Sequence, residues 1–427
     1  MGKKLPLEGI RILDFCHIWV GPYASQLLAD WGAEVIWVES RYHSVRGQAR
    51  PNPKTVAQGQ AFGYPDKEPG DRPWNRSANI NRHARNKLSI TVDNRTEKGR
   101  DIVRQLMAKS DVILENQVPV TAERYGLTWD EASKANPQII LMNMPAFGLD
   151  GPYKNYRTLG SHMEAISGHQ IIRAYPHMDP GQLSDVFPAD AGGAAAAAAV
   201  MMGLVHRKRT GQGLHIEFVT AENFIPYIGD FVMDYTMNGR VHQHEGNQDW
   251  SMAPHQVYKC LGDEQWVTIA CRNDHDWNAL CQVMENPTWT NDPRFSDSLS
   301  RYQNRLALDE YISTWTADKD KFWVMDSLQA LGVPSGAVFN EKDAYNDPHL
   351  EERRFFEDVS HPDAGTHSYP GIQWKLSKTP NKIRRHAPQL GQDNEYIYKE
   401  VLGFTAKEYE KLVSEGHIGM EYDESVP

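Results

Sequence analysis

The chain has 427 residues, with 45 Lys and Arg against 56 Asp and Glu, which gives a formal net charge of −11. This composition is typical of a globular protein, and the length suffices for two or three domains with their own cores, which excludes a small disulfide scaffold. The overall acidity argues against nucleic acid as a partner. The four cysteines form no C-x-x-C pair and no ligand-like spacing with histidine, so we expect reduced thiols, a cytoplasmic location and no metal.

The N-terminal sequence MGKKLPLEGIRILDF contains no apolar segment of the kind that a secretion signal has, and Pro6 stands where a myristoylation signal has Ser or Thr. The longest apolar run, 194–205, is shorter than the roughly 20 residues that a membrane span needs. We therefore expect neither a membrane-spanning segment nor a lipid anchor.

The first 150 residues alternate between strand-like and helical patterns. We expect strands at 9–15, 33–39, 88–93, 111–115 and 138–147, and helices at 22–31 and 96–109. This alternation predicts an α/β fold with a Rossmann-like parallel sheet covered on both faces. Ligands of such sheets bind at the carboxyl ends of the strands, beside the amino termini of the helices.

The rest of the chain predicts a second domain and a return to the first. Helices are expected at 158–168, 190–208 and 222–237, with a strand at 214–219, and residues 240–335 are rich in Trp, Asn and Asp. Further expected strands lie at 256–261, 265–271, 337–339 and 372–376, and further helices at 277–284, 305–315, 322–331, 396–402 and 406–414. We expect a large domain at 1–215, a linker helix at 216–240, a smaller α+β domain at 241–335, and a C-terminal segment at 336–427 that rejoins the large domain.

Positive charge is concentrated between residues 41 and 87, which hold ten Lys or Arg against three Asp or Glu. The segment is poor in aliphatic residues and rich in Pro, Gly, Asn and Gln, as a long loop is, and long loops in compact domains are often functional. A small polyanion is the expected partner, and a solvated linker is the alternative.

The first strand-to-helix turn, residues 14–22, contains one glycine, so the G-x-G-x-x-G signature of NAD binding is absent. His17 and Trp19 lie in this turn, where ligands of the sheet approach, although a histidine packed against its own fold is equally consistent. The pair His242 and His244 offers two metal ligands without a third, and metal sites need three or four.

Asp190 stands at the start of a predicted helix, directly before Ala191, Gly192 and Gly193. An N-cap is the simplest interpretation of such an Asp. The helix dipole would also keep this carboxylate ionised, and glycine amides beside it are suited to stabilising an oxyanion. Asp190 is therefore a candidate nucleophile.

A series of short motifs in one order resembles the class III CoA-transferases, the formyl-CoA transferase or carnitine CoA-transferase-like family. They are residues 7–15, Gly21-Pro22, 32–36, 86–90, Glu115-Asn116, 147–153, 209–213 and 387–391. The resemblance implies that CoA, as acyl-CoA, and a carboxylic acid are the partners, that no metal takes part, and that the protein is an intertwined homodimer.

The resemblance also implies the site residues. The family's nucleophilic aspartate falls on Asp190, with Asp185 as an alternative because the count to the following turn is one residue short. The family has an arginine at the position of Ser40, and Arg41 next to it is a plausible substitute. The implied CoA contacts are His17, Trp19, Arg41, Val92, Arg95, Asn116, Arg124 and Tyr125.

In this family the aspartate attacks an acyl-CoA to give a mixed anhydride and then an aspartyl-CoA thioester, which an acceptor carboxylate attacks. Trp19 replaces a smaller polar residue of the formyl-CoA transferases, Gly160 stands where they have a tyrosine, and their glycine-rich loop is not found. These departures argue against formate or oxalate as substrates, and the sequence does not identify the acids.

Two other functions stay open at this point. The α-methylacyl-CoA racemases are similar, but the position of their histidine is Leu159 here, while His162 lies elsewhere on the same expected helix. The third interpretation is a non-catalytic CoA-binding protein in which Asp190 only caps a helix.

Overall fold

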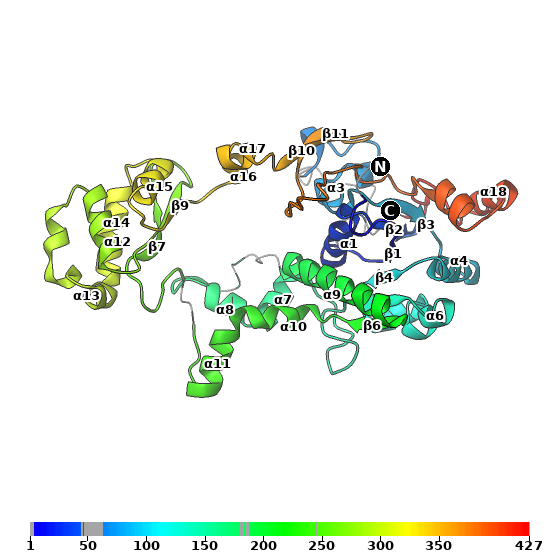
Figure 1. Ribbon diagram of the computed structural model, residues 1–427, viewed down its shortest axis with the longest axis horizontal. Coiled ribbons are helices and arrows are strands. Elements are labelled where there is room, and N and C mark those ends of the chain that lie inside the picture. The colour runs from blue at the N-terminus through cyan, green and yellow to red at the C-terminus, as the bar shows by residue number, and fades with distance from the viewer. Residues whose placement is uncertain are drawn as a thin grey trace. The chain divides into compact units, whose positions relative to one another are not determined.

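The computed structural model describes residues 4–43, 46, 63–179, 181, 183, 188–243 and 246–426 (Figure 1). The chain divides into two compact units. Unit 1 comprises Met1–Ser167, Ser184–Gly229 and Glu352–Pro427, and unit 2 comprises Gly168–Leu183 and Asp230–Glu351. The expected small domain at 241–335 thus has a counterpart that is longer at both ends and takes in a short segment before residue 184.

Unit 1 contains a parallel sheet of six strands in the order β3-β2-β1-β4-β5-β6. The register places Ile12 opposite Val35 on one side and Val112 on the other. This confirms the α/β fold with a parallel sheet. The strands are β1 (Arg11–Asp14), β2 (Glu34–Glu39), β3 (Leu88–Thr91), β4 (Val112–Glu115), β5 (Ile140–Asn143) and β6 (Leu214–Glu217).

Neighbouring residues of a strand point to opposite faces of the sheet, and in this sheet both sets are apolar. Helices therefore cover both faces. Leu13 packs in one core with Leu106, while Ile12 packs in the other with Leu27 and Val200. The helices of this part are α1 (Val20–Asp30), α2 (Pro73–Arg76), α3 (Ala78–Ala84), α4 (Glu97–Ala108), α5 (Pro119–Arg124), α6 (Trp129–Ala135), α7 (Gly160–Ile166), α9 (Pro188–Thr210) and α10 (Thr220–Phe224).

The C-terminal part of unit 1 departs from the expected elements. The strand expected at 372–376 is absent, since Trp374 and Leu376 are exposed and cannot serve a core. An antiparallel hairpin of β10 (Phe356–His361) and β11 (Gly365–Pro370) precedes it instead. The helix expected at 396–402 is the π-helix η6 (Tyr396–Val401), and α18 (Ala406–Ser414) matches its expected range.

Unit 2 is built on a three-stranded antiparallel sheet in the order β7-β8-β9. Its core contains Trp277, Leu308, Ile312, Val324 and Leu328. The elements are α8 (His169–Arg173), α11 (Gly229–Asn238), β7 (His255–Lys259), β8 (Trp266–Ala270), α12 (Asp274–Val283), α13 (Ser298–Gln303), α14 (Arg305–Thr316), α15 (Lys321–Gln329), β9 (Ser335–Ala337), α16 (Glu341–Tyr345) and α17 (Pro348–Glu352).

The expectation of a single long helix at 222–237 is wrong. The segment forms α10, the 3-10 helix η3 (Ile225–Ile228) and α11. Pro226 explains the interruption, because proline has no N–H to donate and clashes with the preceding turn of an α-helix. The expected linker at 216–240 therefore contains the end of β6 and three short helical elements.

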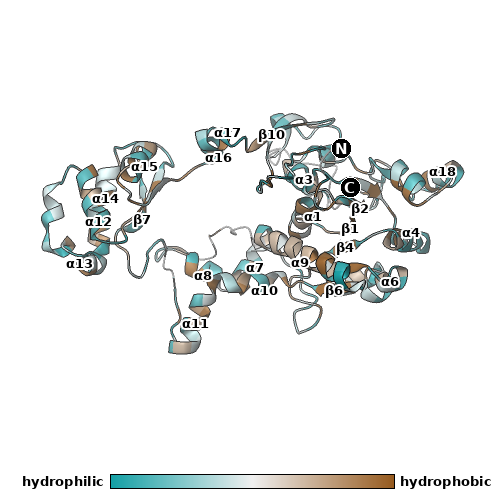
Figure 2. Cartoon of the chain, viewed as in Figure 1, coloured by the Kyte–Doolittle hydropathy of each residue, from teal (hydrophilic) through white to brown (hydrophobic). Residues whose placement is uncertain are grey.

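Among the described residues, one helix, Ala189–Thr210 within α9, is long and apolar enough by length and composition to cross a membrane. Figure 2 shows mostly apolar colours along α9. The helix packs against α1, β5 and β6, and its Ala196, Ala197 and Val200 are buried in the unit 1 core. One side of α9 therefore packs in the unit 1 core, while its Met202 and Val205 are exposed.

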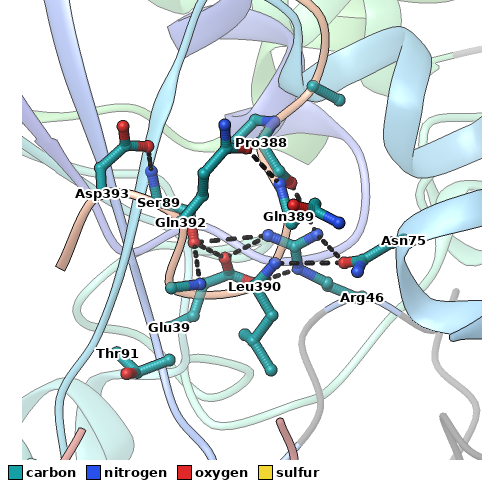
Figure 3. Close-up of polar contacts among 12 residues, drawn as sticks. Glu39, Arg46, Asn75, Ser89, Thr91, Pro388, Gln389, Leu390, Gln392 and Asp393 are labelled. Carbon is teal, nitrogen blue, oxygen red and sulfur yellow. Dashed lines mark hydrogen bonds and ion pairs between the residues drawn. The ribbon is translucent and has the colours of Figure 1, made fainter. Parts of the chain in front are cut away.

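A buried ion pair fixes the start of the basic segment to the sheet (Figure 3). The guanidinium of Arg46 donates from Nε and Nη2 to both carboxylate oxygens of Glu39, each at 2.5 Å, and neither side chain is exposed. Arg46 Nη1 also donates to Asn75 Oδ1 at 3.0 Å and to the carbonyl of Pro388 at 2.9 Å. Four separate parts of unit 1 thus meet at one guanidinium.

We predict that Arg46→Ala lowers the free energy of unfolding by about 3–5 kcal/mol, because it leaves the buried Glu39 carboxylate without its cation. Urea unfolding followed by circular dichroism measures this. Arg100→Ala is the matched control, since its ion pair with Glu97 is exposed and such pairs contribute about 1 kcal/mol or less. Equal losses in the two variants would contradict the prediction.

Candidate active site

Asp190 lies in the first turn of α9, as the third residue of the helix that begins at Pro188. The N-cap interpretation of Asp190 is therefore wrong. The carboxylate still lies at the positive end of the helix dipole, which favours an anion. Gly192 and Gly193 are the fifth and sixth helical residues, whose amides have acceptors within the helix, so the expected oxyanion role of these glycines is not supported.

The two glycines instead let α9 approach α1. A Cβ on Gly193 would lie 2.8 Å from the carbonyl oxygen of Val20 and 2.8 Å from the Tyr23 ring, and one on Gly192 would lie 3.1 Å from Val20. Real Cβ atoms do not come so near a backbone oxygen. The glycines therefore bring the first turn of α9 against the start of α1.

Trp19 joins the two helices at this point. It is the N-cap residue of α1, and its indole Nε1 donates a hydrogen bond of 2.8 Å to Asp190 Oδ1. The preceding Ile18 has a φ of 69°, a conformation that costs a β-branched residue energy. The strained Ile18 thus directly precedes Trp19, in the turn that directs the Trp19 side chain at Asp190.

Arg82 of α3 completes this group. Its guanidinium lies 4.1 Å from the centre of the Trp19 ring, and its Nη2 lies 3.7 Å from Asp190 Oδ1. Its Nε donates to His83 Nε2 at 3.0 Å. Burial lowers the pKa of His83 well below its usual value, with Arg82 adding to the effect, so the imidazole is neutral and accepts this bond.

Arg82 was missed as an individual site residue. The sequence did place it within the cationic 41–87 segment, which was expected to bind a small anion. Burial lowers the pKa of the Arg82 guanidinium, and the negative charge of Asp190 opposes that shift. Burial and the same carboxylate raise the pKa of the neighbouring Tyr23.

A buried network holds the turn that carries His17 and Trp19. Lys87 Nζ donates to Asp14 Oδ2 at 3.0 Å and to Ser25 Oγ at 2.7 Å, and the Lys87 and Asp14 side chains are almost fully buried. Asp14 Oδ1 in turn accepts from the amide of Cys16 at 3.0 Å. The network fixes the backbone of the turn from behind.

A second group of the expected residues meets at the carboxyl ends of β1 and β4. The Asn116 side chain accepts from the amide of His17 and donates to its carbonyl, both at 2.8 Å. The His17 ring stacks on that of His43 at 6.4 Å, and His43 stacks on Tyr125 at 6.3 Å. Three of the implied CoA contacts, His17, Asn116 and Tyr125, thus lie in one cluster.

Burial lowers the pKa of His17 to about 4, with His43 adding to the shift, so its ring is neutral at pH 7. At the end of β4, burial raises the pKa of Glu115 to about 7, although Asn143 and the amide of Gln117 donate to its carboxylate. No sequence pattern marked Glu115 as a group with an altered pKa.

The other implied contacts occupy different surroundings. Val92 is buried in the core of unit 1, so its side chain is not available to a ligand. Arg95 pairs with Asp93 at 2.7 Å and stacks on Tyr42, while Arg41 donates to the carbonyls of the C-terminal residues 416 and 421. Arg124, at the end of α5, is exposed.

The described residues contain no group of three or more His, Cys, Asp and Glu arranged to hold a metal ion. His242 hydrogen-bonds to Asp234 and stacks on Trp250, and His244 lies outside the described residues. Asp185 also lies outside them. A hollow of about 750 Å³ in unit 2, lined by residues such as Asn247, His255 and Thr268, includes none of the candidate residues.

Comparison with known proteins gives a consistent result over most of the chain. The model of CoA-transferase family III matches residues 7–394. The chain is 31% identical to a succinyl-CoA–D-citramalate CoA-transferase of Chloroflexus aurantiacus, covering 94% of this chain and 95% of that one. It is 26% identical to a formyl-CoA:oxalate CoA-transferase of Bradyrhizobium sp., covering 96% of each. A crystal structure of a CaiB/BaiF family protein from Brucella suis has a TM-score of 0.80 at 26% identity, covering 93% of this chain and 100% of that one.

We predict that the His17 ring titrates with a midpoint near pH 4, because its burial disfavours the imidazolium. Its contribution to stability is complete above the unfolded-state pKa of about 6.5 and declines as the pH falls towards 4. Imidazole chemical shifts measured by NMR across this pH range test it, with the spectrum of His17→Asn as the assignment control. A His17 midpoint near 6.5 would contradict this prediction.

Proposed function

The chain belongs to CoA-transferase family III, and we propose that it moves CoA from an acyl-CoA donor to a carboxylic acid through covalent intermediates on Asp190. Membership of this family makes the protein a class III CoA-transferase. The observation that carries the mechanistic proposal is the position of Asp190, hydrogen-bonded to Trp19 and facing Arg82 at the first turn of α9.

The contacts of Asp190 distinguish its two oxygens. Among the described residues, the hydrogen bond from Trp19 and the ion pair with Arg82 both go to Oδ1. We assign the nucleophilic role to Oδ2. Its attack on the acyl-CoA carbonyl forms a C–O bond and breaks the C–S bond, which releases CoA as the thiolate and leaves a mixed anhydride on Asp190.

The thiolate then attacks Cγ of Asp190, the donor acid leaves as its carboxylate, and an aspartyl-CoA thioester remains. The acceptor carboxylate attacks the same carbon and expels the thiolate, which finally attacks the acceptor carbonyl and regenerates Asp190. In both attacks on Cγ, negative charge develops on Oδ1, the atom to which Trp19 donates its hydrogen bond at 2.8 Å. No metal or redox partner is needed to balance these steps.

We place the CoA moiety along the carboxyl ends of β1 and β4. The cluster of His17, Asn116 and Tyr125 lies there, and Trp19 leads from it to Asp190. Arg95 and Arg124 are assigned to the phosphates because both are cationic and exposed, and because Arg124 directly precedes Tyr125 of this cluster. Arg41 and Val92 contribute by supporting this surface.

In the part of the chain that the structure describes, no feature favours the racemase or the non-catalytic alternative. Leu159, at the position of the racemase histidine, is an exposed residue before α7. His162 Nδ1 accepts a hydrogen bond of 3.1 Å from the amide of Leu159, which is a local contact at the start of α7. Succinyl-CoA is the first donor to test because a similar protein is named for it.

We further propose that the protein acts in the cytoplasm as a homodimer. The cysteines at 16, 260, 271 and 281 are free and buried, as in a reducing compartment. Helix α11 has no buried residue, and its apolar Met233 and Met237 are 59% and 72% exposed. A ten-residue helix is marginal alone in water, so a second copy of the chain is the proposed cover for this face.

We predict that Asp190→Asn lowers kcat for CoA transfer by at least about 10³-fold, because an amide cannot form the anhydride. The measurement is the steady-state rate of acceptor thioester formation from succinyl-CoA, followed by liquid chromatography and mass spectrometry. Asp130→Asn is the matched control, since Asp130 is an exposed acid in the first turn of α6. An active Asp190→Asn enzyme would move the nucleophile elsewhere.

We predict that Arg124→Ala raises the KM for acyl-CoA by roughly 10-fold and leaves the KM for the acceptor acid within 2-fold, since a charge-assisted contact to phosphate is lost. Initial rates with each substrate varied in turn give both constants. Arg104→Ala serves as the control, because Arg104 pairs with Glu97 on the exposed side of α4. A change confined to the acceptor constant would refute the phosphate assignment.

A further inference from the structure

Arg82 has contacts that suit it to hold a substrate anion beside the nucleophile. Its side chain is 38% exposed and lies over the Trp19 ring, which holds the plane of the guanidinium. Its Nε is occupied by His83. The Nη2 group is 3.7 Å from Asp190 Oδ1, which is close enough for attraction but too long for a hydrogen bond.

The charge of Asp190 changes during the proposed reaction, and that of Arg82 does not. In the resting enzyme the carboxylate and the guanidinium neutralise each other. In the anhydride and in the thioester, Asp190 carries no negative charge, so the half-buried guanidinium loses its only ion-pair partner among the described residues. The acceptor must approach at this stage, and it approaches as a carboxylate.

We infer that Arg82 binds the reacting carboxylate of the acceptor acid, exchanging the anion of Asp190 for that of the substrate when Asp190 is acylated. The inference rests on the proposed function. Arg82 then guides the acceptor to Cγ and, in the preceding half-reaction, receives the donor acid that leaves Cγ. The ligand class is therefore any carboxylate, recognised at the group that reacts.

Distance favours the reacting carboxylate over two other anions. An acid oxygen about 2.9 Å from Nη2 can lie in contact with the carboxyl group of Asp190, which is itself 3.7 Å from Nη2. The second carboxylate of a dicarboxylic acid is separated from the reacting one by the carbon chain. The CoA phosphates are separated from the sulfur by the whole pantetheine arm, so they cannot reach Arg82 while the sulfur is at Asp190.

The test uses two variants of the full-length protein, Arg82→Met and Arg82→Lys, with succinyl-CoA as donor. Met keeps apolar contact with the Trp19 ring, and Lys keeps the charge without the planar fork. Butyrate and glutarate serve as a monocarboxylate and a dicarboxylate acceptor. Arg72→Ala is the control from the same basic segment, since Arg72 pairs with Glu421 at an exposed position. Circular dichroism and Tm verify that each variant is folded.

For Arg82→Met we expect the KM of both acceptors to rise by roughly 10- to 100-fold, as for loss of a charge-assisted hydrogen bond, with the KM of succinyl-CoA within 2-fold of wild type. Arg82→Lys should fall between Arg82→Met and wild type, and added guanidinium ion should restore part of the acceptor affinity of Arg82→Met. This split between substrates is not expected of a merely structural arginine.

Three results would overturn the inference. A loss seen with glutarate alone would place Arg82 at the distal carboxylate, a change in the succinyl-CoA constant alone would place it at CoA, and unchanged constants would give it no role. Failure of the proposed function looks different, because wild-type protein would then form neither acceptor thioester nor an adduct on Asp190 with any acyl-CoA of a donor panel.

Discussion

The contact between the start of α1 and the first turn of α9 is the constraint on which the proposed site depends. Gly193 permits it, because a Cβ at that position would lie 2.8 Å from the carbonyl oxygen of Val20. Across this contact Trp19 reaches Asp190, a residue 171 positions away in the sequence, with a hydrogen bond of 2.8 Å. Without it the carboxylate would lack a fixed orientation, and neither of its oxygens would be distinguished as the nucleophile.

Buried charge supports this contact from within unit 1. The Lys87–Asp14 pair fixes the turn before Trp19, and the Arg46–Glu39 pair fixes the beginning of the cationic segment that contains α3 and Arg82. Buried ion pairs of this kind often add little to stability compared with apolar packing, but they hold a defined geometry when every partner is satisfied. Here they hold two segments that contribute side chains to one carboxylate.

The sequence predicted the sheet well because its central strands are buried on both faces and therefore form short apolar runs. It also placed Asp190 at a helix start and assigned His17, Asn116 and Tyr125, which the structure brings together. Three features could not be predicted from the sequence, for physical reasons. Pro226 breaks a helix whose apolar pattern continues through it, β10 and β11 carry few apolar residues, and the approach of Arg82 to Asp190 depends on tertiary packing that no local pattern encodes.

The most direct measurement for this account is peptide mass spectrometry of the protein after incubation with succinyl-CoA in the absence of an acceptor acid. We predict an adduct with the mass of CoA less one water on Asp190, and its disappearance when an acceptor acid is added. CoA transfer that proceeds with the adduct on another residue, or with none even after rapid quenching, would contradict it.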